Sequence, residues 1–211
     1  MAVGRDDSTL LPLIVARVHG VWGAAVDLVR SGLSQGELTA VSCSAPGTCV
    51  AVGHDVATNA PFAVREQGGV FGPVDRLTSI SIGGNTTTLA GYFTGVSCPT
   101  ATSCTAIGYD VDKALPFLTT LTNGTWSTPL LIGIDHALNG VELNGISCVN
   151  ATTCMAVGVD HNLNQATTLA ENNGQWSPLT NLLTTRMRGN LHSNQGVFTA
   201  CLLYTSDAAD E

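Results

Sequence analysis

Charged side chains are scarce in this chain. Asp, Glu, Lys and Arg make up 11% of its 211 residues, with 8 basic residues against 16 acidic ones. A nucleic-acid-binding domain usually carries a clustered basic stripe, and the sequence has none. No run of 18 apolar residues occurs either, so no membrane-spanning segment is expected. These absences exclude nucleic acid as an expected partner and a membrane span as an expected element.

Helical patterns are also lacking. No segment combines helical periodicity with capping residues at both ends. The nearest candidate, residues 22–33, aligns with segments that contain Pro73 and Pro129, and proline interrupts helices. Instead, short runs rich in β-branched residues alternate with turn signals that contain Gly, Pro or Asn-Gly. The sequence therefore predicts an all-β protein.

The chain repeats itself four times. Each copy has an Ala-Val-Gly or Ala-Ile-Gly string, an aromatic residue 20 positions after the alanine, and a glycine two positions before that aromatic. The alanine-to-alanine spacings are 49, 55 and 50 residues. The aligned segments are 2–22, 51–71, 106–126 and 156–176. A fixed period of this length is typical of repeat architectures.

Six of the seven cysteines form three identical Cys-x5-Cys pairs, which lie before the last three of these segments: Cys43/Cys49, Cys98/Cys104 and Cys148/Cys154. Zinc prefers closer spacings with a second ligand pair nearby. We therefore interpret the pairs as disulfides, with free buried thiols as the alternative. Each bridge would close a short hairpin and contribute roughly 2 kcal/mol on the loop-entropy model. Disulfides predict an oxidising compartment outside the cytoplasm.

Four short strands are expected in each repeat of about 50 residues, which is the make-up of one β-propeller blade. We expect a partial propeller of about four four-stranded blades, or else another all-β repeat array such as a solenoid or sandwich. The domain covers residues 1–200, and the repeats lie at approximately 1–35, 36–90, 91–140 and 141–200.

Two longer links, at 74–94 and 179–199, correspond at an offset of 105 residues. This correspondence suggests that the array grew by duplication of a pair of repeats.

The unit Ser-Cys-x5-Cys-x-Ala-Val-Gly, followed by Gly-x-Trp, resembles a family of secreted bacterial repeat proteins known best from actinobacteria. That family is propeller-like and distantly similar to sialidases. The resemblance covers residues 2–200 and implies export and a disulfide between the first two strands of each blade. It implies no established catalytic residues.

Both chain ends depart from the repeat. Met1 takes the place of Met155, so we interpret it as an internal methionine of a longer protein whose first repeat lacks its opening strand and cysteines. Residues 201–211, CLLYTSDAADE, fit no repeat position and resemble a translated sequencing adapter, with a natural polar tail as the alternative. Without this segment, 13 acidic residues remain against 8 basic ones.

The recurring aromatic residues are interpreted as core side chains wedged between blades, because one aromatic can bury 150–250 Å². They are Trp22, Phe71, Trp126 and Trp176. The small side chains of Ala51 and Gly53 are expected to let adjacent blades or strands approach closely.

An aspartate recurs two residues after the glycine of each Ala-Val-Gly or Ala-Ile-Gly string. The four are Asp6, Asp55, Asp110 and Asp160. The four could form a ring of carboxylates at a channel mouth, or could accept backbone hydrogen bonds within turns. We favour the turn role, since a residue present in every repeat generally serves the repeat. The variable residues just before them are better ligand candidates. The candidate ligand-facing set is Arg5, His54, Tyr109, Asp55, Asp110 and Asp160, and Val159 shares the variable position.

Catalytic signatures are absent from the sequence. The arginines fall at unrelated repeat positions, although a sialidase-like site would cluster them around a substrate carboxylate. No Gly-x-Ser-x-Gly elbow occurs. We expect an exported, non-catalytic binding or scaffold protein with no metal or cofactor, whose partner is an extracellular glycan or protein. The alternative is a fragment of a propeller-type, sialidase-like glycoside hydrolase or of a lyase.

Overall fold

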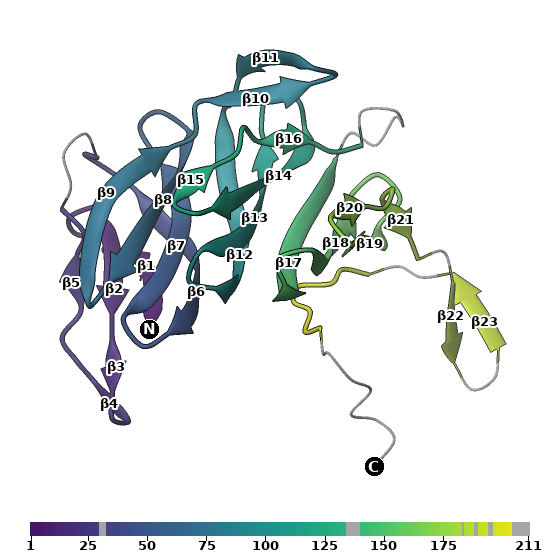
Figure 1. The fold of residues 1–211 in the computed structure, drawn as a ribbon. Coiled ribbons are helices and arrows are strands. Elements are labelled where there is room, and N and C mark those ends of the chain that lie inside the picture. The colour runs from purple at the N-terminus through teal and green to yellow at the C-terminus, as the bar shows by residue number, and fades with distance from the viewer. Residues whose placement is uncertain (30–32, 134–139, 183, 188–189, 194–195, 204–211) are drawn as a thin grey trace.

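The computed structural model describes residues 1–29, 33–133, 140–182, 184–187, 190–193 and 196–203 (Figure 1). Every regular element in these residues is a β-strand, which confirms the predicted all-β class. None of the sheets formed by the described strands closes on itself. Within the same residues, nothing helical could serve as a membrane span.

Repeat 2 has the simplest sheet, an antiparallel meander in the order β6-β7-β8-β9. Its strands are β6 (Glu37–Ala45), β7 (Thr48–Asp55), β8 (Ala60–Gln67) and β9 (Val70–Arg76). The β8–β9 turn places Gly68 and Gly69 at φ of 60° and 82°. Two consecutive residues with positive φ match the right-handed twist of a tight hairpin, which explains why glycine occupies this turn.

Repeats 3 and 4 follow the same order but break their fourth strand in two. Repeat 3 has β12 (Gly91–Thr100), β13 (Ser103–Asp110), β14 (Leu115–Thr122), β15 (Thr125–Trp126) and β16 (Leu130–Leu131). Repeat 4 has β17 (Val141–Asn150), β18 (Thr153–Asp160), β19 (Gln165–Asn172), β20 (Gln175–Trp176) and β21 (Thr180–Asn181). Pro129 and Pro178 lie in the breaks, and proline has no N–H to donate to a ladder. In repeat 2, β9 continues through Pro73, which lies at a register shift against β8.

Repeat 1 contributes a three-stranded sheet, β1-β2-β5, and a separate hairpin of β3 and β4. The strands are β1 (Ala2–Arg5), β2 (Pro12–Val15), β3 (Arg17–Val18), β4 (Val21–Trp22) and β5 (Val26–Asp27). The weak helix candidate therefore carries strands in its described part.

The two long links each form a hairpin. The first link forms β10 (Ser79–Ile82) and β11 (Asn85–Thr88). The second link forms β22 (Thr184–Met187) and β23 (Asn190–Ser193). The pairs lie 105 residues apart, so the correspondence of the links is confirmed. Strand β10 also pairs in parallel with β16, which joins the first link to the sheet of repeat 3.

The sheets stand side by side in chain order (Figure 1), and β12 of repeat 3 contacts both β6 and β17 of its neighbours. A hydrophobic core fills each junction. Leu38 and Phe62 are fully buried between repeats 1 and 2, and Phe93 and Phe117 between repeats 2 and 3. Both faces of an inner sheet are thus covered by the neighbouring repeats.

The recurring Ala-Val-Gly string serves two junctions at once. Ala51 is fully buried in the core shared with repeat 1, while Val52 is fully buried in the core shared with repeat 3. The alanine therefore allows close approach between repeats, as expected. The glycine acts within its own repeat, because a Cβ on Gly53 would overlap the carbonyl oxygen of Glu37 on β6.

A β-bulge in each first strand turns one side chain toward the next repeat. Thr39 Oγ1 donates to Phe93 O at 2.6 Å, and Thr94 Oγ1 donates to Leu143 O at 2.6 Å. Asn144 Nδ2 donates to Phe198 O at 3.0 Å. The bulge residue thereby links successive first strands.

The serine of the Ser-Cys motif makes a second link of this kind. Ser42 Oγ accepts a hydrogen bond from the Cys98 N–H at 2.9 Å, and Ser97 Oγ accepts one from the Cys148 N–H at 2.9 Å. Ser147 Oγ accepts one from the Leu203 N–H at 3.1 Å. Residues 196–203 therefore lie against repeat 4 as β12 lies against repeat 2. Residues 204–211 of the proposed adapter segment lie outside the described residues, and its foreign origin stays a prediction.

The three predicted disulfides are confirmed. The S–S distances are 2.06 Å for Cys43–Cys49, 2.12 Å for Cys98–Cys104 and 2.09 Å for Cys148–Cys154. Each bridge joins the first and second strands of its repeat. Cys201 is a free thiol.

The core role expected of the aromatic residues holds for three of the four. Phe71, Trp126 and Trp176 pack against the cores that their repeats share with the preceding repeat. For Trp22 the expectation is wrong, since this residue is 52% exposed. The sheets of the described chain leave the β3–β4 hairpin uncovered, and the guanidinium carbon of Arg17 lies 5.8 Å from the Trp22 ring centroid.

Candidate functional site

Asp55, Asp110 and Asp160 are the last residues of their second strands, and their carboxylates bond to the turns that follow. Asp55 Oδ1 accepts hydrogen bonds from the N–H groups of Ala57 and Thr58, at 2.9 and 3.1 Å. Its Oδ2 accepts one from Arg76 Nη2 at 2.6 Å. Although burial opposes ionisation, the hydrogen bonds from Arg76 and from these backbone groups hold the pKa of Asp55 below its ordinary value.

Asp110 and Asp160 repeat this arrangement. Each accepts two backbone N–H bonds through Oδ1. Asp110 Oδ2 accepts a hydrogen bond from Lys113 Nζ at 3.0 Å. Asp160 Oδ2 accepts one from Asn181 Nδ2 at 2.8 Å. Asp55, Asp110 and Asp160 are at most 2% exposed. Their contacts are those of turn residues, and their carboxylates are occupied within their own repeats.

The variable residues lie at a common edge of the array. The disulfide hairpins lie at one edge of the array. Each first strand begins at the opposite edge, and each second strand ends there, so the side chains of successive repeats meet at that edge. Glu37 lies directly across from His54, and Tyr92 from Tyr109. We call this set the polar row: Arg5, Glu37, His54, Tyr92, Tyr109, Glu142 and His161.

Contacts along the polar row cross every junction between repeats. Arg5 Nη1 lies 4.0 Å from Glu37 Oε2. The His54 and Tyr92 ring centroids are 5.9 Å apart, as are those of Tyr92 and Tyr109. The row is thus continuous from repeat 1 to repeat 3.

The row ends in a hydrogen-bonded cluster on repeat 4. The Tyr92 hydroxyl donates to Glu142 Oε1 at 3.1 Å, and His161 Nε2 lies 3.3 Å from Glu142 Oε2. Val159, across from Glu142, is buried and contributes no polar group.

Partial burial sets the charge state of the row. Burial lowers the pKa of His54 and so favours its neutral imidazole, although Glu37 and Asp55 act in the opposite direction. Burial and the Glu142 charge raise the pKa of Tyr92 to about 12. The same two causes raise the pKa of Tyr109. Both phenols therefore remain protonated at neutral pH and can donate hydrogen bonds.

One buried polar atom of the row has no hydrogen-bond partner. His54 Nδ1 is buried and makes no hydrogen bond. A buried polar atom without a partner costs about 1–3 kcal/mol, so it is a favourable contact point for an added group.

Three of the sequence-predicted ligand residues, Arg5, His54 and Tyr109, lie in this row, whereas the carboxylates of the three aspartates bond to the turns behind it. Sequence reasoning missed Glu37, Tyr92, Glu142 and His161. A usable signal was present for the first three, because they occupy one aligned position at the start of the first strand and differ in type between repeats.

The chemistry available here is hydrogen bonding, aromatic contact and charge of both signs. Among the described residues, no three His, Cys, Asp or Glu side chains lie together in a way that would hold a metal ion. No family model matches the chain, and no curated protein matches it. Its own geometry defines its class: an all-β array of four sheet-forming repeats, with a disulfide in each of the last three.

Proposed function

We propose that this protein is an exported, non-catalytic binding or scaffold protein whose repeats are blades of a partial β-propeller and whose ligand contacts the polar row. The observation that carries the proposal is the row itself. Its side chains come from all four repeats and meet at one edge, yet they differ in type from repeat to repeat. Residues that served only the fold of each repeat would be the same in each.

Export is supported by the three disulfides, because such bridges persist in oxidising compartments. The blade assignment is supported by the four-strand order of the repeats and by the side-by-side first strands.

Binding fits the row better than glycoside hydrolysis does. Sialidases use a tyrosine nucleophile, and the Tyr92–Glu142 pair has the residue types for one. However, the pKa of Tyr92 is raised to about 12, which suits a hydrogen-bond donor rather than a nucleophile. Arg5 is the only arginine that belongs to the row as described, and one arginine is a poor clamp for a substrate carboxylate.

The test is a binding screen of the oxidised full chain against arrays of sialylated and neutral oligosaccharides and of extracellular-matrix peptides. For at least one retained probe, Tyr92→Phe and Glu142→Gln should each weaken binding about tenfold, because each removes one hydrogen-bonding group from the row. Ser44→Ala, at the disulfide edge, is the matched control and should bind as the parent does.

Retention that neither row substitution changes, or no retention on any array, would contradict the proposal. Release of hydrolysed product from a bound oligosaccharide would favour the hydrolase alternative.

A further inference from the structure

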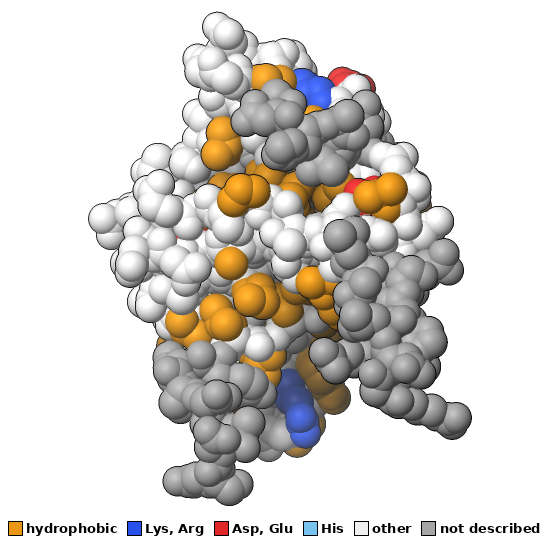
Figure 2. Space-filling model, turned by 90° about the vertical axis from the view of Figure 1, so that its right-hand side faces the viewer, with side chains coloured by type: hydrophobic (Ala, Val, Ile, Leu, Met, Phe, Trp, Pro, Cys, Tyr) orange, Lys and Arg blue, Asp and Glu red, His pale blue; other side chains and the backbone are white. Residues whose placement is uncertain are grey.

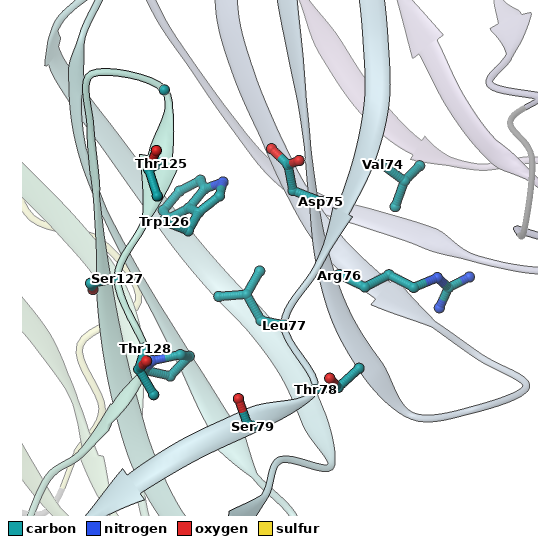
Figure 3. A pocket seen from close by; sticks show the side chains of 12 residues that line it. Val74, Asp75, Arg76, Leu77, Thr78, Ser79, Thr125, Trp126, Ser127 and Thr128 are labelled. Atoms are coloured by element: carbon teal, nitrogen blue, oxygen red, sulfur yellow. The ribbon is translucent and has the colours of Figure 1, made fainter. Parts of the chain in front are cut away.

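A second candidate site lies away from the polar row, in a groove of about 470 Å³ between repeats 2 and 3. One wall is the end of β9 and the link that follows it, residues 74–79. The other wall is the segment around β15, residues 124–129 (Figure 3). Hydrogen bonding between Ser81 N and Pro129 O, at 2.8 Å, ties the two walls together at one end. A groove of this size lies within the range of small-molecule sites.

Two polar atoms on opposite walls lack hydrogen-bond partners. Trp126 Nε1 is a buried donor and Asp75 Oδ2 is a buried acceptor, and neither forms a hydrogen bond. Figure 3 shows the Trp126 ring and the Asp75 carboxylate pointing toward one another across the groove. Each such atom costs free energy until a partner reaches it.

The charge of Asp75 is offset by Arg65. Arg65 Nε lies 3.4 Å from Asp75 Oδ2, which makes an ion pair without a hydrogen bond. The same guanidinium reaches the other wall, where a Cβ on Gly124 would lie 3.0 Å from Arg65 Nη1. Arg76, although on the same strand, points away from the groove (Figure 3) and binds Asp55. These two atoms are therefore an acceptor whose charge is balanced by Arg65 and a neutral donor. Among the described residues that line the groove, the one cationic side chain, Arg76, is bound to Asp55, so the groove does not favour an anion.

We propose that this groove binds a neutral saccharide unit, one hydroxyl of which bridges Asp75 and Trp126. A hydroxyl is both donor and acceptor on one atom, so it can donate to Asp75 Oδ2 while it accepts from Trp126 Nε1. The side chains of Thr78, Ser79, Thr125 and Thr128 also line the groove, and hydroxyl groups match those of further sugar positions.

The indole contributes through its N–H edge and not as an exposed stacking platform. Its ring packs on the core between repeats 2 and 3, with its centroid 6.3 Å from that of Phe93. Trp126 is thus a core residue whose polar edge reaches the groove. The groove and the polar row share no residue, so this inference does not depend on the proposed role of the row.

The test is isothermal titration of the oxidised full chain with maltose, cellobiose, chitobiose and lactose at millimolar concentrations, and with neutral dipeptides as a comparison. At least one disaccharide should bind. Trp126→Phe keeps the aromatic packing and removes the N–H, and Asp75→Asn replaces the charged acceptor. Each should weaken that binding about tenfold, which corresponds to about 1.4 kcal/mol.

Trp176→Phe is the matched control, since Trp176 holds the equivalent position in repeat 4 and lies outside the groove. It should leave the affinity unchanged. Circular dichroism of each variant establishes that it folds as the parent does. Binding of dipeptides alone, of no disaccharide, or of a disaccharide equally well by Trp126→Phe and Asp75→Asn would overturn the proposal.

Discussion

At position 158 the first and second strands of repeat 4 approach each other so closely that only a hydrogen atom fits. A Cβ there would overlap the carbonyl oxygen of Glu142. The equivalent glycine of repeat 1, Gly4, has no atom within 4 Å of its would-be Cβ. One sequence motif therefore occupies two different environments.

Gly158→Ala should lower the free energy of unfolding by about 3 kcal/mol, because the new methyl group must displace backbone. Gly4→Ala should change it by less than about 1 kcal/mol. Urea denaturation of both variants measures the difference. Equal effects at the two positions would show that the close approach at residue 158 does not limit stability.

Glu171 is a buried carboxylate in the core-facing part of β19. It is 5% exposed, its Oε2 has no hydrogen-bond partner, and burial raises its pKa above the ordinary value of 4.5. Repeat 3 has the buried Leu121 at the same position. Glu171→Leu should therefore raise the free energy of unfolding at pH 7, by about 1 kcal/mol.

The gain from Glu171→Leu should depend on pH. Because the folded-state pKa is raised, the carboxyl is protonated in both states below pH 4.5, where its charge costs nothing. As pH rises through the folded pKa, the parent loses stability that the variant keeps. Denaturation at pH 3.5 and pH 7 should show a gain at the higher pH only, and an equal gain at both would contradict burial of the charge.

At the residue scale, much was predictable from repetition. The cysteine pairing follows from spacing alone, and the turn role of the aspartates follows from their presence in every repeat. The exposure of Trp22 was not predictable, because it depends on whether another sheet covers the β3–β4 hairpin. Part of the polar row was predictable, namely Arg5, His54 and Tyr109. Tyr92 and Glu142 were not, because they join the row only through contact between strands of neighbouring repeats.

At the scale of the strand, the first strands are held to one another by side chains and not by a shared backbone ladder. Ser97 accepts the Cys148 N–H of the next repeat, and Thr94 donates to the Leu143 carbonyl. These hydrogen bonds fix the position of one first strand along its neighbour, and so the relative position of adjacent sheets.

Ser97→Ala should lower the free energy of unfolding by about 1 kcal/mol, since the Cys148 N–H loses its acceptor. Ser44→Ala, at a half-buried position of β6, is the control and should be neutral. Amide hydrogen exchange at Cys148 supplies the second readout and should become faster in Ser97→Ala alone. Unchanged exchange would indicate that the serine does not hold this junction.

The four-stranded meander of repeat 2 was predictable, because alternating residues and Gly- or Asn-containing turns are local signals. The division of the fourth strand in repeats 3 and 4 was not predicted. The bulges were not, because a bulge is defined by register against the neighbouring strand. The parallel pairing of β10 with β16 was equally hidden, since it joins a link to the sheet of the following repeat.

At the scale of the whole molecule, the two ends of the array expose apolar side chains. Val18, Val21 and Trp22 are exposed at the repeat 1 end, and Val197 and Leu202 beside repeat 4. Figure 2 shows hydrophobic side chains scattered over the face at the repeat 4 end, with few charged side chains among them. Few charges are present to keep copies apart.

The protein should therefore associate in a concentration-dependent way through these end faces. Sedimentation velocity between 1 and 100 µM, a range chosen to span typical transient affinities of about 10⁻⁶–10⁻⁴ M, measures it. Leu202→Lys should reduce the association, whereas Val70→Lys, at an exposed site on β9, should not. A parent that stays monomeric and melts in one sharp transition would contradict this expectation.

Within the described part of the chain, all extensive contacts between sheets join consecutive repeats. Such an arrangement has no element that every repeat must touch, and its stability accumulates one junction at a time. Copies can therefore be gained or lost in evolution while the surviving junctions keep the same residues. Edge side chains can then diversify independently, so one framework can come to recognise many different molecules.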